Sequence, residues 1–150
     1  MTDHIIRVSI RTVIFNQNNE ILVEHSLRPH EDYYYLPGGG VWFHEKIEDG
    51  LVREVKEETG LEVKAERLLW VRDFVDGFPD LHGIELFFLA TIIGGQFKPE
   101  HDTEPIEHSF MEVEMLENIR FYPESFIEKL KLIRDDRNWS ETNPYMRSAP

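Results

Sequence analysis

Three glutamates in the segment 53–58 are the side chains best placed to do chemistry. Glu54, Glu57 and Glu58 lie three and four residues apart, so on a helix they share one face and span an arc of roughly 100°. Like charges at this spacing repel, by roughly 0.2–0.5 kcal/mol per pair on an isolated helix. Arg53 can reach Glu57 one turn away, but three carboxylates call for more positive charge. A divalent cation with oxygen ligands would supply it.

The residue types indicate which cation this would be. The helix carries no His or Cys at ligand spacing, which favours Mg2+, or else Mn2+, over Zn2+. The alternative is an ordinary solvated face, the commoner role of a glutamate-rich helix. Upstream, Gly38–Gly40 would let the backbone approach a ligand closely and expose carbonyl groups to a cation or N–H groups to an anion. Glycine triplets are more often plain turns, so the spacing between the triplet and the glutamate run must decide between a ligand site and a turn.

That spacing follows a known pattern. Gly39 is followed by five residues and Glu45, then by seven residues and the run from Arg53 to Leu61, Arg-Glu-Val-Lys-Glu-Glu-Thr-Gly-Leu. The arrangement resembles the signature of the Nudix hydrolase family, which includes MutT-like proteins, with every specified position filled. The resemblance implies an α/β protein with the Nudix fold, an α/β/α sandwich with a mixed central β-sheet. It also implies a Mg2+-dependent hydrolase that cleaves the diphosphate linkage of a nucleoside diphosphate derivative, of the ADP-ribose or nucleotide sugar type, by attack of water on phosphorus.

Carried over position by position, the signature implies a role for each residue. The metal ligands would be Gly39, through its carbonyl or that of Gly38, together with Glu54, Glu57 and Glu58. The catalytic residues would be Glu54, Glu57, Arg53 and Glu104; Glu54 would bind metal or orient water, and Arg53 would orient the glutamates by salt bridging. Glu45 would stabilise the loop and helix. The general base would come from the acidic loop after the helix, with Glu104 preferred and Glu107 next. Substrate would contact Gly39, Gly40 and Trp42, the last because an aromatic face can stack on a base.

The chain pattern predicts the elements that position these residues. The expected elements are a hairpin of strands 5–15 and 21–23 with a turn at 16–19, an aromatic strand 33–36 ended by a turn at 37–40, a helix 45–59 stopped by Gly60, one or two strands over 62–75, a turn at 76–80, a strand 84–93 buried on both faces, a polar loop 96–108, a strand 109–113, and a helix from Pro123 through Ile133. Length predicts a single domain over residues 1–150, with 134–150 as a loosely ordered tail.

Composition restricts the partners. The chain has no cysteine and a formal net charge of -13, which favours a cytoplasmic location and disfavours long nucleic acid and membrane surfaces. A small nucleotide-like diphosphate remains the expected partner, and the family resemblance adds a homodimer. A nucleoside triphosphate pyrophosphatase and a catalytically silent nucleotide-binding regulatory module are the alternatives, although such modules typically lose signature glutamates. An isoprenoid diphosphate isomerase would need an active-site cysteine, and net charge disfavours RNA decapping.

Overall fold

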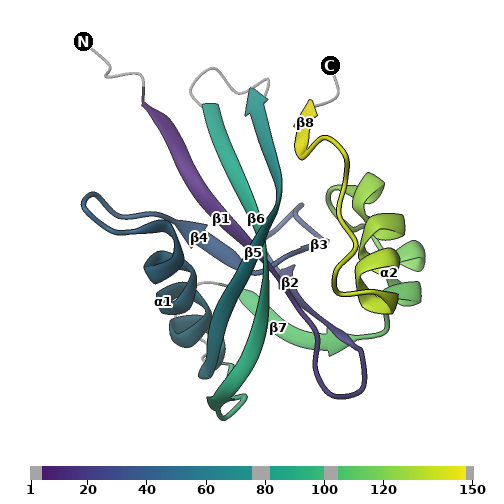
Figure 1. Cartoon of the computed structure of the whole chain (residues 1–150). Helices are drawn as coiled ribbons and strands as arrows, with labels where there is room; N and C mark the ends of the chain where they lie inside the picture. Colours follow the sequence, from purple (N-terminus) through teal and green to yellow (C-terminus); the bar gives the residue numbers. More distant parts are fainter. Residues whose placement is uncertain (1–4, 76–81, 100–104, 148–150) are drawn as a thin grey trace.

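A computed structural model describes residues 5–75, 82–99 and 105–147 (Figure 1). The elements follow in the order β1 (Ile6–Ile14), β2 (Ile21–Ser26), β3 (Tyr33–Tyr35), β4 (Gly38–Gly40), α1 (Ile47–Thr59), β5 (Leu61–Val75), β6 (His82–Gly95), β7 (Ile106–Met111), the short 3-10 helices η1 (Val113–Asn118) and η2 (Glu124–Phe126), α2 (Ile127–Asp135) and β8 (Tyr145–Arg147).

The strands of the described residues form two sheets. The larger has the order β4-β1-β6-β5-β8, and the smaller has the order β3-β2-β7. In the larger sheet β1 runs parallel to β6, and β8 runs parallel to β5, whereas the other pairs are antiparallel. The sheet is therefore mixed, as the family resemblance implied.

Two apolar clusters hold the helices on opposite sides of the strands (Figure 1). On one side α1 buries Leu51 and Val55 against Ile10, Ile14 and Leu22. On the other side α2 packs its apolar stripe onto an aromatic group made of Trp70, Phe87 and Phe126. The result is an α/β/α sandwich, as the family resemblance implied.

The helix that carries the glutamates has clear ends. Glu48 and Asp49 lie in its first turn, where carboxylates interact favourably with the helix dipole. Gly60 ends it in a left-handed conformation with φ 77°, and its N–H donates to the carbonyl of Lys56. The predicted stop at Gly60 is confirmed, although α1 begins at Ile47 rather than Glu45.

The predicted opening hairpin is wrong. One isolated bridge joins Phe15 to Ile21, and beyond it β1 and β2 enter different sheets. Both edges of β1 are already paired, one with β4 and the other with β6, so β2 has no free edge of β1 to join. The hairpin-like sequence therefore links the two sheets.

The glycine triplet is a strand rather than the predicted turn. Gly38–Gly40 pairs antiparallel with Ser9–Arg11 of β1. A Cβ at position 38 would lie 1.8 Å from the carbonyl oxygen of Ile10, a distance that excludes any side chain. Glycine is therefore required for this edge strand to lie against β1.

Several other boundaries differ from those predicted. A single strand, β5, covers the region 62–75, where one or two strands were expected, and β6 is buried on both faces only at 87–90. The predicted polar loop ends earlier than expected, because β7 begins at Ile106. Pro123 precedes η2, so that α2 begins at Ile127. The predicted turn at 76–80 lies outside the described residues.

The C-terminal segment is more ordered than the expected loose tail. Residues 145–147 form β8 on β5, and Trp139 and Met146 pack against the larger apolar cluster. Arg67 Nη2 donates to the carbonyls of Arg137, at 2.9 Å, and Trp139. Contacts with β5 therefore hold this segment, which its polar composition could not indicate. Within the described residues, the structure contains no helix long and apolar enough to cross a membrane.

Candidate functional site

Helix α1 brings the three glutamates to one rim of the sandwich, beside β4. The apolar face of α1 is fixed by the fully buried Leu51 and Val55, which sets the rotation of the helix. The side chains of Glu54 and Glu58 are then largely covered, with 15% and 20% exposed, whereas that of Glu57 is 53% exposed. The predicted convergence of these carboxylates on one face is present.

Arg53 uses its whole guanidinium group at this rim. Its Nε and Nη2 donate to the two carboxylate oxygens of Glu45 at 2.6 and 2.9 Å. Its Nη1 donates to Glu54 at 2.8 Å and to Glu57 at 3.3 Å, and Nη2 also donates to the carbonyl of Gly40 at 3.2 Å. Arginine has five N–H donors, so these bonds account for all of them.

The pKa values of this pair reflect the same contacts. Hydrogen bonds from Arg53 lower the pKa of Glu45 to about 2. The bond to Glu45 correspondingly raises the pKa of Arg53 above its usual range, despite the opposing effect of partial burial. Both groups are therefore ionised at neutral pH and act as a fixed charged support for Glu54 and Glu57.

The other predicted signature positions lie around this support. Gly39 passes so close to Glu54 that a Cβ would lie 2.5 Å from its carboxylate carbon. Trp42 places its ring over the guanidinium of Arg53, 3.6 Å from the ring centroid, and its backbone N–H donates to Glu45. Trp42 therefore covers Arg53, while 60% of the residue stays exposed to solvent.

Two residues that the sequence reasoning missed lie against Glu58. His108 of β7 places Nε2 3.0 Å from Glu24 Oε1 on β2 and 3.5 Å from Glu58 Oε2. Burial disfavours a charged imidazole, but the two carboxylates outweigh it and raise the pKa of His108 to about 9. Burial raises the pKa of Glu58 to about 8. A charged residue at an inward position of an apolar strand, as at Glu24, is the sequence signal that could have identified this cluster.

The donors at this rim fit a divalent cation. Glu58 Oε2 is buried, and among the described residues it accepts no hydrogen bond, its contact with His108 Nε2 being a longer one of 3.5 Å. A buried carboxylate oxygen that accepts no hydrogen bond is costly. The carboxylates of α1 and the carbonyls of β4 form an oxygen-rich set, which suits Mg2+ or Mn2+. Glu24, Glu58 and His108 also bring one ligand atom each within 4.8 Å of one another.

The general base is not located among the described residues. Glu104, the preferred candidate, lies outside them. Glu107 is exposed on β7, and because side chains alternate along a strand it faces away from His108 and hence from Glu58. The geometry therefore does not favour Glu107.

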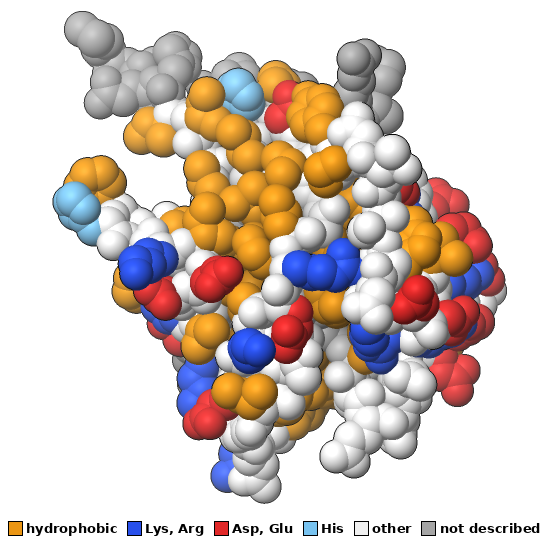
Figure 2. Space-filling model, viewed as in Figure 1, with side chains coloured by type: hydrophobic (Ala, Val, Ile, Leu, Met, Phe, Trp, Pro, Cys, Tyr) orange, Lys and Arg blue, Asp and Glu red, His pale blue; other side chains and the backbone are white. Residues whose placement is uncertain are grey.

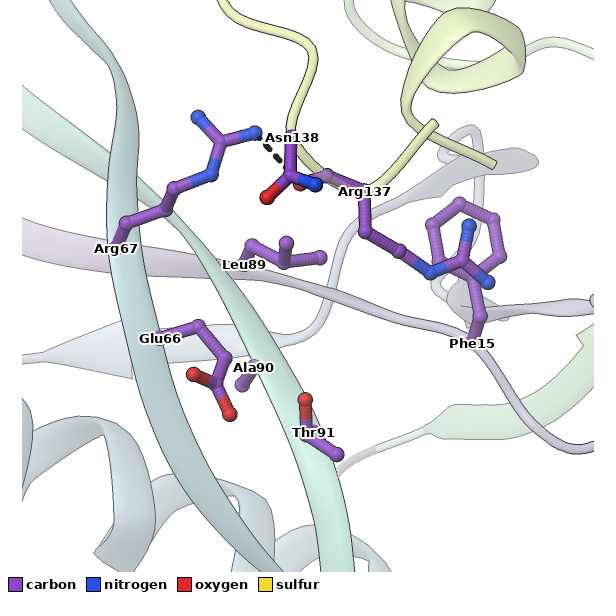
Figure 3. A pocket seen from close by; sticks show the side chains of 8 residues that line it. All are labelled: Phe15, Glu66, Arg67, Leu89, Ala90, Thr91, Arg137 and Asn138. Atoms are coloured by element: carbon purple, nitrogen blue, oxygen red, sulfur yellow. Dashed lines mark hydrogen bonds between the residues drawn. The ribbon is translucent and has the colours of Figure 1, made fainter. Parts of the chain in front are cut away.

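Two larger hollows flank the fold. A pocket of about 420 Å³ is lined by β5, β6, Phe15 and the segment after α2 (Figure 3). Its arginines already have partners: Arg67 donates to backbone carbonyls, and Arg137 donates to carbonyls and lies over the ring of Phe15.

The second hollow, about 720 Å³, lies between the first half of β1 and the segment 40–43. It is bordered by exposed hydrophobic side chains, which gather over the upper ends of β1, β5 and β6 (Figure 2). Neither hollow is lined by the three glutamates of α1.

Comparisons with known proteins agree with this geometry. The family model described as NUDIX domain matches residues 6–130. An ADP-ribose pyrophosphatase from Methanocaldococcus jannaschii is 33% identical over 88% of this chain and 73% of its own length. An 8-oxo-dGDP phosphatase from Danio rerio is 33% identical over 65% of this chain, which spans 30% of that protein.

Solved structures show the same fold. An ADP-ribose pyrophosphatase from Streptococcus suis has a TM-score of 0.67 and 26% identity, with 95% of this chain and 98% of that chain covered. A UDP-X diphosphatase has a TM-score of 0.71 at 19% identity, with coverage of 99% and 70%. Because the signature residues lie together at one rim and the family model spans most of the sequence, this chain belongs to the NUDIX domain family and is a Nudix-type pyrophosphohydrolase.

Proposed function

We propose that this protein hydrolyses the diphosphate linkage of a nucleoside diphosphate derivative, of the ADP-ribose or nucleotide sugar type, in a Mg2+-dependent reaction. The observation that carries the proposal is the sharing of one face of α1 by three carboxylates, of which Glu54 lies against Gly39, while Arg53 bonds to Glu54, Glu57 and the carbonyl of Gly40. Two relatives named ADP-ribose pyrophosphatase support the substrate class. Mn2+ is the alternative cation.

The residues would divide the work as follows. Glu54, Glu57, Glu58 and a carbonyl of β4 would hold the cation. The carbonyl of Gly38 is better placed for this than that of Gly39, because Gly39 pairs with Ile10 and its carbonyl faces β1. When bound, the cation would neutralise charge on the non-bridging phosphate oxygens and acidify or position the attacking water. Glu54 would also orient that water, and Arg53 would fix the carboxylates of Glu54 and Glu57 through its bonds to them. Glu104 is the proposed general base.

The rest of the substrate is proposed to lie along β4. Gly40 and the exposed face of Trp42 flank the carboxylates, and an aromatic face binds a nucleobase without hydrogen-bond readout. A smaller hollow of about 70 Å³ lies farther in, lined by groups that include Arg11, Tyr35 and Arg72. Both arginines are paired there with Glu85, Arg11 at 3.2 Å and Arg72 at 3.4 Å.

Three further predictions of the sequence remain proposals: a single domain over residues 1–150, a cytoplasmic location and a homodimer. The exposed hydrophobic side chains over β1, β5 and β6 (Figure 2) would be one surface for a second copy.

The direct test is product analysis by chromatography after incubation with Mg2+ and separate substrates. The panel comprises ADP-ribose, nucleotide sugars, dinucleoside polyphosphates and nucleoside triphosphates. We expect release of a nucleoside monophosphate from ADP-ribose or a nucleotide sugar, abolished by a chelator. Pyrophosphate release from triphosphates alone would favour the pyrophosphatase alternative. Binding without turnover across the panel would favour the silent regulatory module.

Replacing Gly39 with alanine should lower turnover while leaving the fold intact. The three atoms nearest to the new Cβ all belong to the carboxylate of Glu54, at 2.5–2.6 Å, so we expect Glu54 to shift rather than the backbone. A misplacement of about 1 Å can reduce turnover by up to about a hundredfold, and we expect a tenfold loss or more in steady-state kinetics.

Gly94→Ala is the matched control for this change. Its Cβ would also meet a glutamate carboxylate, that of Glu62 at 3.0 Å, but away from the proposed site. Equal activity losses in the two alanine variants would contradict a specific role for the Gly39–Glu54 contact.

A further inference from the structure

The three glutamates of α1 are not held in the same way. Arg53 bonds to Glu54 and Glu57, and its remaining donors go to Glu45 and Gly40. No donor of Arg53 is left for Glu58. Within the described part of the chain, the positively charged or donor group that approaches the Glu58 carboxylate is His108, at 3.5 Å.

His108 is placed for this contact by β7 and β2. Its side chain is only 5% exposed, and its Nε2 is shared between Glu24 and Glu58. β2 and β7 pair antiparallel with Glu24 directly opposite His108, so the two side chains lie on the same face of that sheet. The imidazole therefore reaches Glu58 from the smaller sheet, whereas α1 packs mainly on strands of the larger one.

A line of alternating charges continues behind His108. Glu24 also approaches Arg11 of β1 at 3.6 Å, and Arg11 donates to Glu85 of β6 at 3.2 Å. Glu85 in turn lies 3.4 Å from Arg72 of β5. Buried charges are tolerated when each is paired and hydrogen-bonded, and here every member has an oppositely charged neighbour on a different strand. Rotation of His108 away from Glu24 would leave a buried carboxylate short of a partner.

We propose that His108 is a positioning residue: held by Glu24 and Arg11, it fixes the carboxylate of Glu58 in the orientation that binds the cation. The inference rests on the proposed function, in which Glu58 is a metal ligand. Replacing a residue that orients a metal ligand typically lowers the affinity for the metal by about 10–100-fold. His108 would therefore act on the cation through Glu58, without contacting it.

The test is Mn2+ binding to the full-length protein, measured from the electron paramagnetic resonance signal of free Mn2+. Wild type is compared with Glu57→Gln, His108→Ala, His108→Gln and His25→Ala. His25 is the matched control, because it also contacts a carboxylate, Asp32 at 2.7 Å, but stacks on Tyr34 away from α1. Glutamine at 108 keeps an N–H at about the reach of Nε2. Thermal unfolding checks the fold of each variant.

We expect His108→Ala to weaken Mn2+ binding about tenfold or more, His108→Gln to recover most of the loss, and His25→Ala to bind as wild type. A further variant, His108→Leu, keeps the bulk of the side chain but has no N–H, and it should not recover the loss. Recovery in His108→Leu would show that His108 merely fills space and would overturn the proposal. If His108→Ala does not fold, Glu24→Gln takes its place and should also weaken binding, because the charge that orients His108 is removed. Wild-type affinity in a folded His108→Ala, or in Glu24→Gln when it replaces that variant, would overturn the proposal.

The same data separate this inference from the proposed function. Binding that is lost in Glu57→Gln but unchanged in His108→Ala would refute the positioning role alone. Absence of Mn2+ binding by the wild type would refute the proposed metal site, and the role of His108 with it.

Discussion

Replacing Glu57 with glutamine is expected to lower Mg2+-dependent turnover about a thousandfold, equivalent to about 4 kcal/mol in the activation barrier. The substitution keeps the shape of the side chain and removes one of the charges that would hold the cation. The side chain is 53% exposed and its described contact is a long one, 3.3 Å to Arg53. The fold should therefore not depend on it, and circular dichroism and the melting temperature should match wild type.

Glu62→Gln is the matched control for Glu57→Gln. Glu62 is equally exposed, at 56%, and also pairs with a basic residue, Lys56 at 3.0 Å, but it lies beyond the end of α1. Turnover of the control should stay within about twofold of wild type, as expected for an exposed ion pair worth under about 1 kcal/mol. If both variants lost activity equally, general loss of acidic charge would explain the effect and Glu57 would not be a specific ligand.

Replacing Arg53 with lysine should lower turnover about a hundredfold although the charge is kept. An ammonium group has three donors on a flexible stem, whereas the guanidinium of Arg53 makes five bonds to Glu45, Glu54, Glu57 and Gly40. At least two of these bonds must be lost, so the carboxylates would no longer be held together. Steady-state kinetics should show the loss mainly in kcat, because misplaced catalytic groups reduce transition-state stabilisation.

Arg134→Lys serves as the control for Arg53→Lys. Arg134 also contacts two carboxylates, Glu114 and Asp135, but it lies on α2, on the opposite side of the strands from α1 (Figure 1). Its replacement should leave kcat unchanged. An Arg53→Lys variant with wild-type kcat would show that positive charge alone is sufficient at position 53.

The sequence predicted helix α1 well because the information that determines it is local. The apolar positions Leu51 and Val55 fix the buried face, Gly60 fixes the end, and the spacing of the glutamates then determines where they point. The contacts of Arg53 with Glu54 and Glu57 could be predicted for the same reason, because these residues lie within about one helical turn of it. For these residues, neighbours in the chain are neighbours in space.

The sequence could not predict the environment of Glu58, because its partners come from distant strands. His108 and Glu24 are 84 positions apart and meet only through the pairing of β2 with β7. The prediction of an opening hairpin was wrong for a related reason. Local alternation identified both strands, but their pairing depends on distant strands, because β4 and β6 pair with the two edges of β1. The glycine triplet likewise lacks the side-chain alternation that reveals a strand.

The meeting of two sheets at one site affects how the protein should lose function on heating. Glu24 and His108 belong to the smaller sheet, whereas α1 packs mainly on the larger one. The two sheets are joined by one isolated bridge, Phe15 to Ile21, and by apolar contacts such as that of Leu22 with Leu51 and Val55. Proteins open locally at lower free-energy cost than they unfold globally. Partial opening of β2 and β7 would separate His108 from Glu58 while α1 kept its hydrogen bonds. A helical signal that survives heating would then overstate the temperature range in which the protein works.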